Sequence, residues 1–213
     1  MASPERSYSS PIRADQARQT RKRIVDAGAA LFAERGYGAT TIDAIAEAAG
    51  VSRKTVFDSV GGKANLMKLA YDFAITGDDA PIPLMDRPRI TDLMDEREPT
   101  ALIAAHAALV TEVGSRIAGI YCALEQAAGT DMEARALYQT LVRQRRTSMD
   151  IPARVMAEAG PGRPGLTRAR VADLLWIYAD PALYDKLVSQ QGWSAKQFEK
   201  WLRRTLEQQL LEY

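Results

Sequence analysis

Apolar residues recur along most of the chain at steps of three and four, the spacing that places them on one face of an α-helix. The first such stripe runs through Ile24, Val25, Ala27, Leu31 and Phe32. We expect its helix to begin near Gln16 and to end at Gly36. The alternation typical of β-strands persists nowhere, and the β-branched residues are scattered. The pattern therefore predicts an all-α chain of about nine helices.

Two short helices joined by a tight corner are predicted by the stretch TTIDAIAEAAGVSRKTVFDSVGGK. Thr41 and Ser52 are suited to cap their N-termini, because a hydroxyl accepts hydrogen bonds from free backbone N–H groups. Gly50 ends the first helix, because glycine adopts the left-handed conformation without steric cost. Arg53 and Lys54 open the second, where the helix dipole disfavours positive charge, so an anionic partner would explain them. The pattern is that of a helix-turn-helix, whose second helix enters the major groove of DNA.

At this point the sequence resembles a known family. The run TIDAIAEAAGVSRKTVFDSVGGKANLM resembles the DNA-binding segment of the TetR family of transcriptional repressors, and RKRIVDAGAALFAERGYGATT resembles the family's first helix and the loop after it. The C-terminal run YADPALYDKLVSQQGWSAKQFEKWLRRTLEQQLL resembles the tail of many members. The resemblance covers about residues 18–70 and 174–213. It implies an N-terminal three-helix helix-turn-helix domain followed by a C-terminal helical ligand-binding and dimerisation domain.

We place the domain boundaries from composition and from this resemblance. Residues 1–16 are rich in Ser, Pro and Arg and have little to bury, so they predict a disordered basic arm. The DNA-binding domain is expected at 17–76 and the ligand-binding and dimerisation domain at 77–213. Four prolines between residues 76 and 100 predict a linker with one helical turn at 92–96.

The expected DNA contacts lie in and around the second helix of the pair. Arg53 and Lys54 are expected to read bases, because arginine or lysine with guanine is the commonest specific pairing. Lys63 is expected to hold a phosphate, as the resemblance also implies. Phe57 stands where the family usually has tyrosine, and Asp58 brings a negative charge toward DNA. The complete expected set is Thr41, Ser52, Arg53, Lys54, Thr55, Phe57, Ser59 and Lys63.

The C-terminal part contains apolar side chains and a few polar ones that would suit a cavity between helices. The family implies an inducer pocket in this region, although aromatic residues and methionines at helical spacing more often form core, and both roles stay open. The candidate pocket residues are His106, Arg116, Tyr121, Cys122, Tyr138, Met156 and Trp176.

The last helices are more apolar than a monomer's surface requires, which indicates an interface. The family implies a four-helix dimer interface, which we assign to about residues 167–211; packing of this face on its own domain stays open as the alternative. The candidate interface residues are Leu174, Leu175, Tyr178, Phe198, Trp201, Leu202 and Leu206.

The charge distribution favours a protein that binds an anionic polymer, and the lack of catalytic and metal-binding motifs argues against an enzyme. Residues 1–70 carry 11 Lys/Arg against 7 Asp/Glu, a net +4, whereas residues 71–213 carry 17 against 20, a net −3. A basic head suits an anionic polymer. The single histidine and single cysteine come without nucleotide, zinc or nucleophile motifs, so we expect no catalytic site, metal or cofactor. No apolar run of about 18 residues and no secretory signal is visible, which favours the cytoplasm and no membrane partner.

The helix-turn-helix pattern and the family resemblance together imply a homodimeric, ligand-responsive repressor that binds a pseudo-palindromic operator in double-stranded DNA and, as the resemblance implies, is released by a small-molecule effector. Two alternatives stay open. One is a DNA-binding dimer without small-molecule input. The other is an all-α ligand-binding protein whose helix-turn-helix has lost DNA affinity, an alternative suggested by Phe57 and Asp58.

Overall fold

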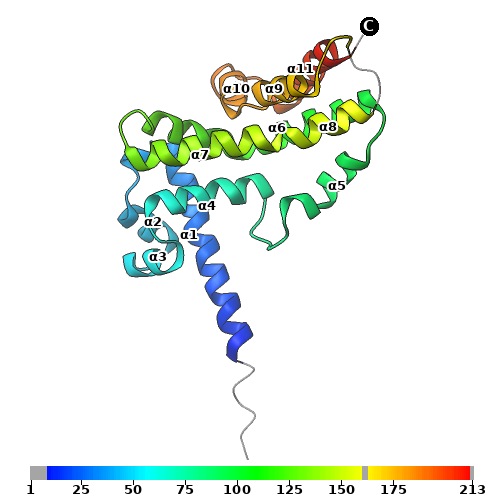
Figure 1. Ribbon diagram of the computed structural model, residues 1–213. Coiled ribbons are helices and arrows are strands. Elements are labelled where there is room, and N and C mark those ends of the chain that lie inside the picture. Colours follow the sequence, from blue (N-terminus) through cyan, green and yellow to red (C-terminus); the bar gives the residue numbers. More distant parts are fainter. Residues whose placement is uncertain (1–8, 160–162, 212–213) are drawn as a thin grey trace, which may run out of the picture.

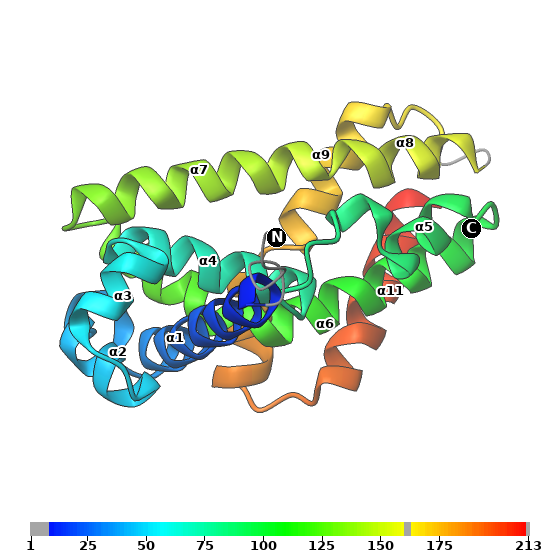
Figure 2. The same ribbon diagram turned by 90° about the horizontal axis from the view of Figure 1, so that it is seen from below.

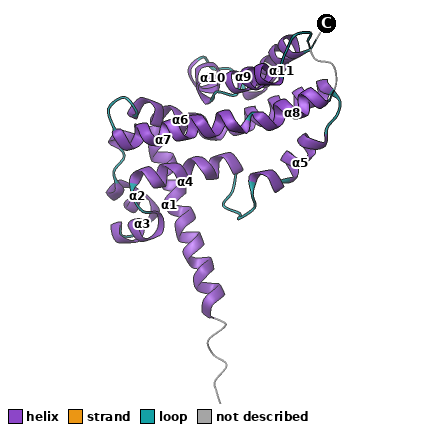
Figure 3. Cartoon of the chain, in the orientation of Figure 1, coloured by secondary structure: helices purple, strands orange, loops and turns teal. Residues whose placement is uncertain are grey.

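The computed structural model describes residues 9–159 and 163–211, with side chains from Arg13 onward. Over these residues the chain forms helices α1 to α11 and two short helical segments, η1 and η2, and contains no strand (Figure 3). The predicted all-α class is therefore confirmed. The helices exceed the predicted number of about nine, mainly because the proline-rich linker is itself partly helical.

Four helices build the N-terminal part: α1 (Ser9–Ala39), α2 (Ile42–Ala49), α3 (Arg53–Val60) and α4 (Lys63–Thr76). We call this part the head. α1 begins before the predicted Gln16, so residues 9–16 of the predicted arm are helical, while residues 1–8 lie outside the described residues. Its regular course is interrupted at Gly36, which has a φ of 79°, where the sequence predicts the helix end. The N-terminal half of α1 projects away from the other helices in Figure 1.

The remaining helices form the body. They are α6 (Pro99–Ala127), α7 (Met132–Ser148), α8 (Asp150–Glu158), α9 (Arg168–Tyr178), α10 (Pro181–Tyr184), η2 (Asp185–Gln190) and α11 (Ala195–Leu210). In Figure 1 the molecule has three tiers, with α9–α11 on one side of α6 to α8 and the head on the other. Figure 2 shows α7 and α8 following one another along one edge.

The long helix α6 connects these tiers, because it packs against α1 and α4 of the head and against α10 and α11 of the body. Two glycines, Gly114 and Gly119, lie inside α6, yet the helix is continuous through both. A Cβ atom at Gly114 would lie 3.0 Å from the ring of Tyr184, and one at Gly119 would lie 3.1 Å from the Cβ of Ala33. These glycines therefore permit close approach of neighbouring helices.

The linker contains more structure than the single turn predicted at 92–96. It contains η1 (Leu84–Asp86) and α5 (Pro88–Asp95), and Leu93 is buried. The Arg87 guanidinium lies 2.8 Å from the Asp78 carboxylate. The buried Leu93 and this ion pair therefore hold the linker in place.

Two large apolar clusters form the core. One joins the head to the body, since Ile24, Val56 and Leu66 share it with Ile117 and Leu141 of α6 and α7. The other lies within the body, between α6 and the C-terminal helices. The head is therefore packed on the body through a continuous core, which means that a change in α6 or α7 can reach the head.

One helix among the described residues has the length and apolar composition of a membrane span. By length and composition α6 could cross a bilayer, because its most apolar window has a mean hydropathy of 1.3. Half of that window is buried inside the molecule, however. This is the pattern of a core helix in a soluble protein, and the packing of α6 on both tiers accounts for its apolar composition.

Candidate DNA-binding surface and internal pocket

The corner between α2 and α3 forms as the sequence predicts. The Thr41 hydroxyl accepts a hydrogen bond from the Ala44 backbone N–H at 3.1 Å, and the Ser52 hydroxyl accepts one from the Thr55 N–H at 3.1 Å. Gly50 ends α2 in the left-handed conformation, with φ 66° and ψ 40°. These local contacts fix the angle between the two helices.

The buried Val56 and Val60 hold α3 against the head, so the opposite side of α3 faces solvent. Arg53, Lys54 and Phe57 lie on this exposed side, and Phe57 is 44% exposed although it is aromatic. Such a surface, with two cations around an apolar ring, can contact both the phosphates and the sugars of a DNA backbone.

Both cations are engaged by carboxylates in this state. The Arg53 Nη1 atom donates to the two oxygens of Asp43, at 3.1 and 2.8 Å, and its guanidinium lies 5.7 Å from the Phe57 ring centre. The Lys54 Nζ atom donates to Asp58 at 2.5 Å. DNA binding would exchange these exposed ion pairs, which are individually weak, for phosphate or base contacts.

Three other predicted contact residues are less exposed. Thr55 and Ser59 are half-buried, and the Thr55 hydroxyl lies 2.8 Å from that of Ser52. Lys63 donates to the backbone carbonyl of Tyr37 at 3.0 Å, with its ammonium 4.2 Å from the Tyr37 ring centre. Tyr37 is itself buried. Since an ammonium has three donors, Lys63 keeps capacity for a phosphate.

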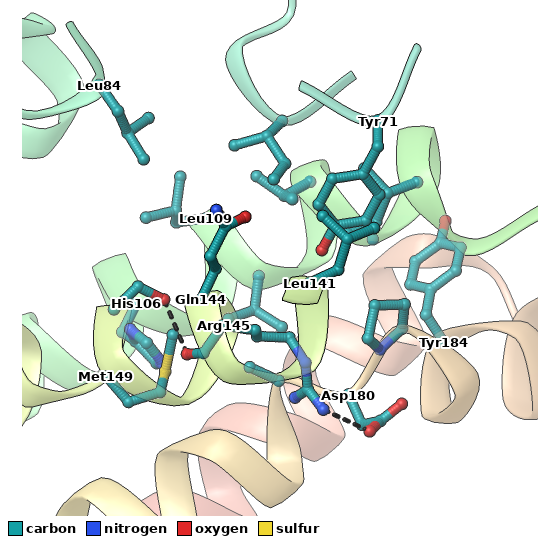
Figure 4. A pocket seen from close by; sticks show the side chains of 18 of the residues that line it. Tyr71, Leu84, His106, Leu109, Leu141, Gln144, Arg145, Met149, Asp180 and Tyr184 are labelled. Atoms are coloured by element: carbon teal, nitrogen blue, oxygen red, sulfur yellow. Dashed lines mark hydrogen bonds and ion pairs between the residues drawn. The ribbon is translucent and has the colours of Figure 1, made fainter. Parts of the chain in front are cut away.

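A second candidate site lies inside the molecule. An apolar cavity of about 280 Å³ opens among α4, α6, α7 and the turn before α10 (Figure 4). Its volume is near the lower end of the range for small-molecule sites. The helix α4 of the head supplies part of the wall, and most of the rest is aliphatic or aromatic. Wall residues include Tyr71 and Ile75 from α4, Val110, Val113 and Ile117 from α6, Leu141 from α7 and Phe198 from α11.

Few polar groups face this cavity. His106 is 3% exposed, and burial lowers its pKa to about 4. Arg145 is 8% exposed and donates from Nη2 to Asp180 at 2.7 Å and from Nη1 to the Trp176 carbonyl at 2.5 Å. The Arg145 side chain points into the protein, toward the turn that contains Asp180 (Figure 4).

Of the seven predicted pocket residues, only His106 is among the described residues that line this cavity. Arg116 instead donates to the carbonyls of Ala74 and Ile75, at 2.6 and 3.0 Å, and so caps the C-terminus of α4. Tyr121 is buried in the core that joins head and body, and Tyr138 packs partly buried against that core.

The last three predicted pocket residues face other hollows. Cys122 and Trp176 border a shallow depression between α6 and α9–α10, and burial raises the pKa of the Cys122 thiol to about 12. Met156 borders a small cleft beside Pro99 and Leu210. The sequence did not predict that α4 contributes to the wall of the cavity. Tyr71 and Ile75 belong to the head, for which the sequence predicts only DNA contacts.

The predicted dimer face also needs correction. Leu175, Phe198, Leu202 and Leu206 are fully buried within the single chain, so they cannot touch a second subunit in this conformation. They form the body's own core, which is the alternative weighed for this segment. Leu174, Tyr178 and Trp201 are only partly buried. The exposed apolar residue that sequence reasoning missed is Ile177, which is 49% exposed.

The fold and the capped helix pair define the class of this protein: an all-helical DNA-binding protein with a helix-turn-helix head. Residues 24–70 match the family model for bacterial regulatory proteins of the tetR family. The chain therefore carries the DNA-binding domain of TetR-family transcriptional regulators, which are DNA-binding proteins and not enzymes. The resemblance seen in the sequence is confirmed.

Solved structures share the fold over nearly the whole chain. A putative transcriptional regulator from Saccharomonospora viridis in complex with choline is 17% identical and has a TM-score of 0.68, covering 92% of this chain and 99% of that one. NalD, the secondary repressor of the MexAB-OprM multidrug efflux pump in Pseudomonas aeruginosa, is 19% identical with a TM-score of 0.64, covering 91% and 97%.

A third structure, the SmeT–triclosan complex, is 20% identical with a TM-score of 0.62, covering 91% of this chain and 92% of that one. At these identities the likeness concerns the fold alone. No curated protein matches the sequence significantly.

Proposed function

We propose that this regulator is a cytoplasmic homodimeric repressor that binds a pseudo-palindromic operator and leaves it when a small molecule fills the cavity beside α4. The head at 17–76 would bind DNA, and the body at 77–213 would bind the effector and the second subunit. The observation that carries this proposal is that α4 belongs to the head and also forms a wall of the cavity, through Tyr71 and Ile75.

The helix α4 connects the two sites mechanically. Its first residue, Lys63, contacts Tyr37 beside the helix pair, and its last turn is held by Arg116 of α6. Asp79, shortly after α4, forms an ion pair of 2.8 Å with Arg18 of α1. A ligand that pushes on the middle of α4 would therefore move an element fixed at both ends to neighbouring helices. Such a ligand weakens DNA binding only if it favours a head position that fits DNA less well.

The proposed DNA contacts divide into two kinds. Arg53 and Lys54 would exchange their carboxylate partners for base edges, while Thr41, Thr55 and Lys63 would set the register on phosphates. Ser52, Phe57 and Ser59 complete the surface, with Phe57 packing on sugars. A dimer would place two α3 helices in successive major grooves, about 34–36 Å apart.

The small-molecule part of the proposal has support from the cavity and from two relatives. The S. viridis regulator was solved with choline and SmeT with triclosan, so members of this fold hold small molecules. For dimerisation we propose the outer surface of α9 and α11, with Ile177, Leu174, Tyr178 and Trp201 in place of the four buried residues.

Selection from random duplex DNA at moderate salt tests the proposal. We expect enrichment of a two-fold symmetric sequence whose half-sites lie about one helical turn apart. A folded, dimeric protein that enriches no sequence would contradict operator binding, and an asymmetric single half-site would contradict the dimeric arrangement.

A further inference from the structure

The cavity beside α4 has a chemical character that narrows its ligand. This inference rests on the proposed function, since it concerns the same site. Most of the wall is aliphatic or aromatic, and the charged side chains that reach it are Asp72, Arg145 and Asp180. Which ligand fits depends on whether these charges have free bonding capacity.

Each charge is paired with an opposite charge of the protein, and only the buried Nε–H of Arg145 has no hydrogen-bond partner among the described residues. Asp180 accepts from Arg145 at 2.7 Å with one oxygen and from the Ala182 backbone N–H at 2.9 Å with the other. Asp72 forms an ion pair of 2.5 Å with Lys68. An ionic ligand would have to leave water and would find only charges that are already paired, so its desolvation would not be repaid.

His106 is one of several polar side chains of the wall without a hydrogen-bond partner among the described residues; Gln144 and the hydroxyls of Tyr71 and Tyr184 are others. No hydrogen bond joins the His106 imidazole to any other described residue, although the side chain is only 3% exposed to solvent. Desolvation alone holds the pKa of this imidazole near 4, so it is neutral at pH 7. A neutral imidazole presents one N–H donor and one acceptor nitrogen.

A hydroxyl group matches these two needs, because it donates and accepts at the same oxygen. A purely apolar ligand would cover the imidazole and leave its polar atoms unpaired, which costs free energy. In Figure 4, His106 lies beside Met149 on one side of the cavity, and Tyr71 and Tyr184 lie on the other. A ligand whose hydroxyl meets His106 would therefore extend its apolar part toward α4.

We propose that the cavity binds an uncharged, mainly apolar molecule that carries a hydroxyl group, with His106 bonding to that hydroxyl and the apolar part resting against α4. The neutral wall selects against ions of both signs. The contact with α4 connects this ligand class to the movement of the head.

Three probes with the same hydrocarbon chain test the class: 1-octanol, octanoate and octyltrimethylammonium. Calorimetry at pH 7.5, without DNA and below the concentration at which any probe forms micelles, gives each dissociation constant. We expect 1-octanol to bind at least about tenfold more tightly than either ion, a difference of about 1.4 kcal/mol. Equal or tighter binding of an ion, or no binding of any probe, would overturn the proposal.

Variants of His106 test the hydrogen bond. His106→Leu should weaken 1-octanol binding by roughly threefold to tenfold, the effect of one net hydrogen bond. His106→Gln keeps a donor and an acceptor and should stay within about threefold of the parent protein. Met156→Leu, outside the cavity, is the matched control, and circular dichroism checks the fold of each variant. Unchanged 1-octanol affinity in His106→Leu would overturn the role of His106.

The same probes separate this inference from the proposed function. If 1-octanol binds through His106 but leaves operator affinity unchanged, the ligand class stands and the proposed release mechanism fails. If an ion binds better and releases the operator, the release mechanism stands and the ligand class fails.

Discussion

The head and the body of this regulator differ in how directly the sequence specifies the functional surface. In the head, function depends on contacts between residues close in sequence, such as the caps at Thr41 and Ser52 and the left-handed Gly50. In the body, the proposed binding cavity depends on contacts between distant segments, such as Arg145 with Asp180. The comparison teaches that a binding surface on one short motif can be read from a sequence, whereas a cavity between helices cannot.

The largest effect should come from breaking the body's buried ion pair. Arg145→Met would leave Asp180 without its partner, and we expect a loss of about 2–3 kcal/mol in the free energy of unfolding, because an unpaired carboxylate whose side chain is only 29% exposed is costly. Urea unfolding followed by circular dichroism measures it.

The matched control is the double variant Arg145→Met with Asp180→Asn, which removes both charges and should recover most of the loss. Because one core joins head and body, DNA binding should be lost at the same urea concentration as helicity. A loss below about 0.5 kcal/mol in the single variant would show that the pair is unimportant for stability.

The next effect concerns base reading by the head. Arg53→Ala should weaken binding to the selected operator by about 1–3 kcal/mol and relax the preference at the bases that it contacts. Lys63→Ala should weaken all DNA sequences alike, because its expected contact is a phosphate. Lys196→Ala, an exposed cation of α11, is the control. Identical behaviour of the Arg53 and Lys63 variants in competition binding would refute this division of roles.

A smaller effect is a pH dependence of the body's stability. An unfolded histidine has a pKa near 6.5, whereas burial lowers the pKa of His106 to about 4. Between these two pKa values the unfolded chain binds more protons than the folded chain does. The free energy of unfolding therefore falls as the pH drops below about 6.5, and the contribution of neutral His106 to stability is fully present above that pH. From pH 7 to pH 5.5 the expected loss from this group is about 1 kcal/mol.

The comparison of the parent protein with His106→Gln isolates this contribution, since all carboxylates are common to both. The stability difference between the two proteins should change by that amount over the interval, as measured by urea unfolding at each pH. A constant difference would mean that His106 is protonated as easily in the folded state as in the unfolded one.

The smallest effect should come from Asp58 in the head. Asp58→Asn frees Lys54 and removes a negative charge from the DNA-facing surface, so affinity at low salt should rise by less than about 0.5 kcal/mol. The gain should disappear at high salt because exposed charges are screened. Asp92→Asn in the linker is the control. A loss of affinity confined to operators with one particular cytosine would instead show that Asp58 accepts from its amino group.

These differences explain which sequence predictions are confirmed. The all-α class, the caps and the corner at Gly50 follow from local periodicity and from residue types with strong backbone preferences. The continuous α6 was harder to predict, because Gly114 acts through the ring of Tyr184, which lies 70 positions away in the sequence.

The cavity could not be predicted for a similar physical reason. Helical spacing shows that Tyr71 faces inward, but not whether another side chain or an open space lies opposite. Arg145 lies four positions after Leu141 on the buried face of α7, and only the tertiary position of Asp180 makes the burial of its charge favourable. Likewise, the apolar stripe of α11 does not reveal whether its partner is the same chain or a second subunit.

The most direct test of the proposed function is a measurement of reciprocity between the two sites. The operator is titrated with and without whichever octyl probe saturates the cavity, and that probe is titrated with and without saturating operator. We predict that each weakens the affinity of the other by the same factor, about fivefold or more. If the cavity is filled and neither affinity changes, then α4 does not couple the cavity to the DNA-binding surface, and the proposed release mechanism is wrong.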